Sequence, residues 1–178
     1  VVGDRTIERG YQEAGVYING KLDTGIGGGI CQVSTTLYNA VLLFDLQIDK
    51  RSNHSLTVPY VPLSRDAAVS WGALDLRFTN NTDYYIYIHS KTTNSSVTFE
   101  LYSTKHDRKV ELVSTMLSKV KAPVIYVDDP AMLFGQQTVI EKGHEGFTSQ
   151  LVKNIYVDGK LISSTLLSKD RYLTAAKI

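Results

Sequence analysis

Residues 25–46 read GIGGGICQVSTTLYNAVLLFDL, a glycine-rich loop followed directly by an apolar segment. Apolar side chains recur in that segment at the spacing of one helix face, at Val33, Leu37, Val41 and Phe44. Leucines at positions 42, 43 and 46 widen this face, as in a helix with protein on several sides. We therefore predict one main buried helix over about residues 31–46, around which the rest of the fold packs.

Extended segments with turn signals lie on both sides of this helix. Before it, Asn19-Gly20 separates two short apolar runs, a strong signal for a β-hairpin. After it, residues 74–78 and 84–89 are expected to pair as a second hairpin. Further strands are expected at residues 47–51, 97–102 and 110–113, and an irregular one at 56–61, where Pro59 intervenes. This pattern predicts an α+β fold in which the helix packs against an antiparallel sheet.

The helical periodicity is gone beyond about Ser114. Glycines punctuate short apolar runs, and Asp158-Gly159 predicts a tight turn between residues 155–157 and 161–162. We predict two units, an α+β domain over residues 1–113 and a small all-β module over residues 114–178.

Composition and charge narrow the class of protein. The 178 residues carry 19 basic and 18 acidic side chains, a net charge of +1, which argues against a strongly electrostatic nucleic-acid binder. No apolar run approaches the roughly 20 residues of a transmembrane helix. The single cysteine excludes an internal disulfide, and the four histidines lack the spacing of a helical metal pair. We expect no metal and no cofactor, and the sequence does not indicate the oligomeric state or what precedes Val1.

Cys31 is the strongest candidate for a reactive residue. The glycines before it permit positive φ angles and close backbone approach. A loop that feeds a helix start presents free N–H groups, here around Gly28 and Gly29, and the helix dipole adds positive charge. These groups would stabilise a thiolate and an oxyanion. The alternatives are a small buried cysteine without chemistry, and a phosphate-binding loop, which lacks the expected Lys-Ser/Thr at its end.

A nucleophilic cysteine needs a base and a group that orients it. His54, in the polar sequence Asn53-His54-Ser55, is the best candidate for the base, and His89 is the alternative. Asp66 follows at a suitable distance to orient the imidazole. An exposed or structural histidine stays open as the plainer interpretation of His54.

Three more residues are candidates for substrate contact. Gln32 has an amide next to the thiol, and Ser34 lies in the first turns of the predicted helix. Arg65 has the guanidinium geometry to bind a carboxylate in a bidentate pair, although a surface ion pair is the more common role of an arginine.

Several stretches of the first unit are similar to the VanW family, and the last unit resembles the five-glycine β module of Gram-positive surface proteins. The VanW-like stretches occur in order at residues 2–6, 19–21, 25–40, 53–55, 58–62 and 65–67. Among them the string from Gly27 to Thr36, GGGICQVSTT, is the most specific.

The resemblance implies an extracellular protein of the Gram-positive cell wall, attached to the wall or anchored in the membrane and facing it. Some VanW members are linked to peptidoglycan cross-linking as cysteine L,D-transpeptidases. The implied activity is the formation of 3-3 cross-links between stem peptides through a thioester on Cys31. The alternatives are a non-catalytic scaffold that binds the wall or glycopeptides, and a cysteine peptidase that hydrolyses the same stems.

Overall fold

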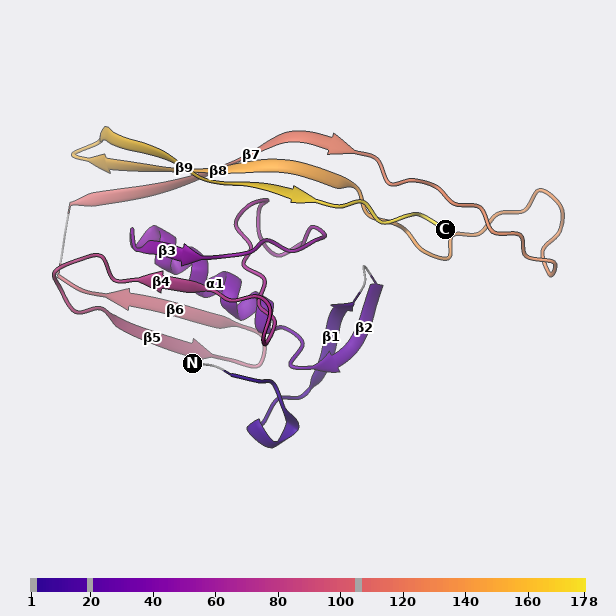
Figure 1. The fold of residues 1–178 in the computed structure, drawn as a ribbon, viewed down its shortest axis with the longest axis horizontal. Coiled ribbons are helices and arrows are strands. Elements are labelled where there is room, and N and C mark those ends of the chain that lie inside the picture. Colours follow the sequence, from indigo (N-terminus) through magenta and orange to yellow (C-terminus); the bar gives the residue numbers. More distant parts are fainter. Residues whose placement is uncertain (1–2, 19–20, 105–106) are drawn as a thin grey trace.

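The protein, a computed structural model, is described over residues 3–18, 21–104 and 107–178 (Figure 1). A short 3-10 helix, Ile7–Arg9, is followed by a hairpin, one α-helix and two further groups of strands. In chain order the elements are β1 (Glu13–Ile18), β2 (Lys21–Ile26), α1 (Ile30–Leu43), β3 (Gln47–Lys50), β4 (Arg77–Thr79), β5 (Tyr87–Thr92), β6 (Val97–Tyr102), β7 (Arg108–Val120), β8 (Gly146–Val157) and β9 (Lys160–Tyr172). One helix with antiparallel sheets confirms the predicted α+β class followed by an all-β module.

Helix α1 begins where the sequence predicts and ends three residues early. Its N-cap is Gly29, with φ of 88°. At the other end Asp45 has φ of 63°, and the N–H of Leu46 bonds back to the carbonyl of Val41. Leu46 is nevertheless only 2% exposed. The apolar pattern therefore continues past the helix because the chain stays in the core, while the backbone has already turned.

The strand pairings agree with the sequence only where the partners are close in the chain. Strands β1 and β2 form the predicted antiparallel hairpin, and its turn, Asn19-Gly20, lies outside the described residues. The predicted pairing of residues 74–78 with 84–89 is wrong, since β4 pairs with β3 and β5 pairs with β6. Residues 56–61 form no strand. The described strands make three two-stranded sheets and one three-stranded sheet in place of one continuous sheet.

The second unit is a sheet of long antiparallel strands in the order β7-β8-β9. Strands β8 and β9 are joined by the predicted turn at Asp158-Gly159, where both residues have positive φ. Residues 110–113, expected in the first sheet, pair instead with residues 152–155 of β8. The expected division between residues 113 and 114 therefore falls inside β7.

One hydrophobic core serves both units. Tyr38 and Leu42 of α1 pack with Ala67 and with Leu151 of β8, all nearly inaccessible to water. Partly buried side chains from both units complete this cluster, namely Ile48, Leu76, Leu112 and Leu167. In Figure 1 the three-stranded sheet runs along one side of the α1 domain, and the chain between β7 and β8 extends beyond that domain.

Candidate active site

Cys31 lies in the first turn of α1 and faces the loop of residues 62–69. Its Sγ atom is 3.4 Å from the carbonyl oxygen of Val69 and 3.5 Å from the Val69 nitrogen, which donates to it. The loop is fixed to the helix by Thr35, whose hydroxyl accepts the N–H of Ala67 at 3.0 Å. The thiol is thus half-buried between a helix start and a tethered backbone segment.

The glycine loop sets the position of the helix start. A Cβ atom on Gly28 would lie 2.6 Å from the Cβ of Ala14 and 2.7 Å from the carbonyl oxygen of Gly15. In the first turn the N–H groups of Ile30, Gln32 and Val33 bond back to loop carbonyls, while Gly29 has no side chain to cap the helix. Within the described residues, the Cys31 N–H is the first-turn donor without a backbone acceptor.

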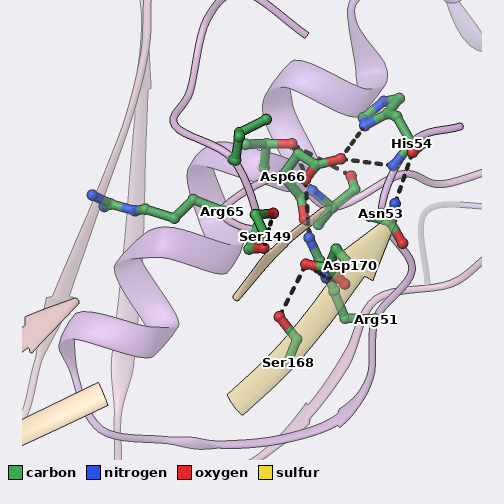
Figure 2. Close-up of polar contacts among 12 residues, drawn as sticks. Arg51, Asn53, His54, Arg65, Asp66, Ser149, Ser168 and Asp170 are labelled. Carbon is green, nitrogen blue, oxygen red and sulfur yellow. Dashed lines mark hydrogen bonds and ion pairs between the residues drawn. The ribbon is translucent and has the colours of Figure 1, made fainter. Parts of the chain in front are cut away.

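His54 lies between the thiol and Asp66. Its Nδ1 atom is 2.7 Å from Oδ2 of Asp66, and the same oxygen accepts the His54 backbone N–H at 2.7 Å (Figure 2). On its other side the His54 imidazole lies close enough to the Cys31 thiol for each group to shift the pKa of the other. The structure therefore brings the three predicted catalytic residues together as Cys31–His54–Asp66.

Asp66 is buried and has all its hydrogen-bonding capacity used. Its carboxylate is 1% exposed, and Oδ1 accepts hydrogen bonds from Nη2 of Arg51 at 2.9 Å and from the Tyr172 hydroxyl at 2.6 Å. With both His54 bonds on Oδ2, each oxygen has two donors. A buried carboxylate with four donors is ionised and has one fixed orientation.

Electrostatics within this group favour a thiolate–imidazolium pair. Burial alone would lower the pKa of His54, but hydrogen bonds to Asp66 and Cys31 raise it to about 9. Burial alone would raise the pKa of Cys31, but hydrogen bonds with His54 and Val69 and the charges of His54 and Arg5 bring it below its ordinary value. Burial likewise opposes ionisation of Asp66, but its hydrogen bonds to His54 and Tyr172 and the charge of Arg51 lower its pKa. These shifts have the direction required of a nucleophile, its base and the group that orients it.

Two residues near the thiol were not identified from the sequence. Arg5 lies against the glycine loop, with Nη1 3.4 Å from the carbonyl oxygen of Gly27, and its charge acts on Cys31. Tyr60 lies close enough for the charge of Cys31 to act on its hydroxyl, and burial raises the pKa of Tyr60 to about 12. Arg5 belongs to the VanW-like stretch at residues 2–6, so the family resemblance includes this residue but does not indicate its function.

The predicted oxyanion- and substrate-binding residues of the helix start lie in different surroundings. Gly28 is packed against β1, Gly29 is exposed at the helix N-cap, and Gln32 is exposed beside the thiol. The Ser34 hydroxyl lies 3.0 Å from the Cys31 carbonyl oxygen and donates to that of Ala67 at 2.6 Å, which ties the helix to the loop.

Arg65 is the one predicted site residue that lies apart from the thiol. Its Nε donates to Oδ1 of Asn39 at 2.7 Å, and the Asn39 amide donates to the Arg65 carbonyl at 2.8 Å. Figure 2 shows its side chain pointing away from Asp66 and His54. Arg65 is thus bound to Asn39 of α1, while the next residue, Asp66, faces His54.

The alternative base does not join the site. His89, the alternative base, is 3.1 Å from Glu100 on the β5–β6 hairpin.

Within the ranges that the structure describes, no three His, Cys, Asp or Glu side chains gather to hold a metal ion. No helix among those residues has the length and apolarity needed to span a membrane.

Comparison with known proteins identifies the families to which the α+β domain and the attached β sheet belong. The family model described as "VanW like protein" matches residues 1–102, and a G5 domain model matches residues 111–177. The chain therefore belongs to the VanW family and continues into a G5 domain. This combination supports a cell-wall-associated protein.

Two curated relatives share this sequence over part of their length. The "Uncharacterized protein YoaR" of Bacillus subtilis (strain 168) is 46% identical over 69% of this chain and 39% of its own. The "Vancomycin B-type resistance protein VanW" of Enterococcus faecalis (strain ATCC 700802 / V583) is 38% identical over 44% of this chain and 31% of its own. The chain thus spans less than two fifths of either relative. Among solved structures, the "Crystal structure of HP0197-G5" is 23% identical with a TM-score of 0.24, over 39% of this chain and 88% of that one.

Proposed function

We propose that this protein is a peptidoglycan L,D-transpeptidase that acts through a thioester on Cys31. The observation that carries the proposal is the Cys31–His54–Asp66 group at the start of α1, in which His54 bonds to the carboxylate on one side and interacts electrostatically with the thiol on the other. Family membership supports the location, at the cell wall, and the thiolate–imidazolium pair supports the reaction class, acyl transfer.

The reaction follows from the roles of these groups. The Cys31 thiolate attacks the carbonyl carbon of the third stem residue, and the Cys31 N–H donates to the oxyanion that forms. As the bond to the fourth residue breaks, the His54 imidazolium gives its proton to the leaving amine of the terminal D-amino acid. An amine from a neighbouring stem then attacks the thioester, His54 accepts its proton, and a new amide forms as the thiolate is regenerated.

A second candidate, a wall-binding scaffold, is favoured by the comparisons taken alone. They support wall association and carry no information about catalysis. The bonds between the Cys31 thiol and the Val69 backbone would also suit a cysteine that only packs. A cysteine peptidase is the third possibility, with water in place of the acceptor amine.

The test is mass spectrometry of purified muropeptides with tetrapeptide stems, incubated with the protein and its variants. We expect cross-linked dimers that have lost one terminal D-residue, none with Cys31→Ala, and about 10²–10⁴-fold slower formation with His54→Gln because proton transfer is lost. His89→Gln is the matched control, since this histidine bonds to Glu100 away from the thiol.

Each other outcome identifies one of the alternatives. Shortened monomers without dimers would assign a peptidase. Unchanged muropeptides with a folded protein that sediments with insoluble peptidoglycan would assign the scaffold. Equal loss of activity in His54→Gln and His89→Gln would contradict the assignment of His54 as the base.

A further inference from the structure

A hydroxyl group of the G5 domain contacts the candidate active site directly. Tyr172, the last residue of β9, is 3% exposed, and its hydroxyl donates to Oδ1 of Asp66 at 2.6 Å. The same hydroxyl accepts the backbone N–H of Ser64 at 2.8 Å. One side chain from the second domain thus binds both the carboxylate and the turn that carries it.

That turn has a backbone conformation that needs support. Ser64 is a fully buried residue with φ of 63°, a left-handed conformation that is unfavourable for residues other than glycine. Its hydroxyl bonds to that of Ser149 on β8 at 2.6 Å. Both hydrogen bonds that hold Ser64 therefore come from the G5 domain, and Asp66 follows two residues later.

A second connection passes through Arg51. Its Nη1 is 2.7 Å from both carboxylate oxygens of Asp170 on β9, and its Nη2 donates to Oδ1 of Asp66 at 2.9 Å. Its Nε donates to the Asp66 carbonyl at 2.6 Å. Figure 2 shows Arg51 between the two carboxylates. Asp170 thereby fixes the guanidinium that, with Tyr172, holds Oδ1 and leaves Oδ2 facing His54.

We propose that Tyr172 is a positioning residue of the Cys31–His54–Asp66 site, supplied by the G5 domain, and that Asp170 assists it through Arg51. The G5 domain is then part of the catalytic unit and more than an attachment to the wall. The inference rests on the catalytic triad of the proposed function and is independent of which substrate that site takes.

The test is the pH dependence of Cys31 alkylation by iodoacetamide in the full chain. If Tyr172 positions Asp66, Tyr172→Phe weakens the Asp66–His54 bond, and the imidazolium that stabilises the thiolate is lost. The midpoint of the pH profile of the alkylation rate should move to higher pH by about one unit. On the acid side of the profile this corresponds to a roughly tenfold smaller thiolate population. Tyr172→Phe should add no further shift to Asp66→Asn, because it acts through that carboxylate.

Matched variants separate positioning from general loosening. Tyr156→Phe removes another G5 hydroxyl, which donates to Glu111 at 2.9 Å, and Lys153→Met breaks the interdomain ion pair with Asp45. Both should leave the midpoint in place. Asp170→Asn keeps Tyr172 and should move the midpoint in the same direction by a smaller amount, which covers the case in which Tyr172→Phe does not fold.

The outcomes that overturn the proposal are distinct from failure of the proposed function. An unchanged midpoint in Tyr172→Phe, or an equal shift in Lys153→Met, would remove Tyr172 from the site. A shift to lower pH would mean that the hydroxyl only withdraws charge from Asp66 and does not position it. If the wild type and His54→Gln are alkylated alike, the triad itself is inactive, and the proposed function fails with it.

Discussion

At the scale of single residues, the thiol of Cys31 is influenced by two cations of different kinds. His54 is charged below a pKa of about 9 and can give up its proton, whereas Arg5 is a fixed charge. The thiolate–imidazolium pair therefore exists between the lowered pKa of Cys31 and the raised pKa of His54. Acyl transfer should rise with pH through the first value and fall through the second, near pH 9.

The two cations can be separated by substitution. Asp66→Asn removes the charge that stabilises the imidazolium. In the profile of rate against pH, the alkaline limb should therefore move to lower pH and the acid limb to higher pH, each by about one unit or more. Arg5→Gln should raise the acid limb by a few tenths of a unit only, since a partly exposed charge is screened. The measurement is the rate of thioester formation against pH. A shift of the alkaline limb in Arg5→Gln would contradict these roles.

At the scale of elements, the junction between the β1–β2 hairpin and α1 determines where the thiol lies. Gly28 packs against the backbone of β1 so closely that no side chain fits. Gly29, one residue later, has open space around its Cα but a φ of 88°. The two neighbouring glycines are thus required for different reasons, contact in one case and backbone conformation in the other.

Because of this difference, we expect position 29 to tolerate a side chain and position 28 not to tolerate one. Gly28→Ala should lower the free energy of unfolding by about 1–3 kcal/mol, as overpacking does, and should slow alkylation of Cys31 by displacing the helix start. Gly29→Asn should cost less than about 1 kcal/mol, because asparagine tolerates the left-handed region. Urea unfolding and alkylation rates check both. Equal losses in the two variants would mean that the loop does not rest on β1 as described.

At the scale of the whole molecule, the VanW domain and the G5 domain share a core. Leu151 of β8 is fully buried against Tyr38 and Leu42 of α1. Lys153 on the same strand pairs with Asp45 just beyond the helix, at 2.5 Å. Since neither domain buries these side chains alone, the two should unfold as one cooperative unit.

A cavity in the shared core should therefore destabilise both domains together. Leu151→Ala should lower the free energy of unfolding by about 2–5 kcal/mol, with a single thermal transition for both domains. Leu161→Ala is the control, because this leucine of the same sheet is 54% exposed and its loss should cost about 0.5 kcal/mol or less. Thermal unfolding followed by circular dichroism, with the exposure of Cys31 as a second signal, measures this. Separate transitions for the two signals would disprove the shared unit.

Local patterns determined much of the architecture. The apolar period predicted α1, Asn19-Gly20 and Asp158-Gly159 predicted two hairpins, and the glycine loop before Cys31 identified the candidate nucleophile. These succeed because a helix and a tight turn depend on neighbours within a few residues. His54 and Asp66 became candidates because few residue types can serve as base and orienting group, and these roles stay predictions.

Only the tertiary structure decided the pairing of β3 with β4, the extent of β7 and the contribution of the second domain to the site. Tyr172 lies 106 residues from Asp66 in the sequence, and Asp170 lies 119 residues from Arg51. Nothing in the local sequence of an aspartate or tyrosine near the end of a strand marks it as a partner of a buried carboxylate. Such contacts depend on how the whole chain packs, so the sequence specified the candidate reacting groups and the fold specified what holds them in place.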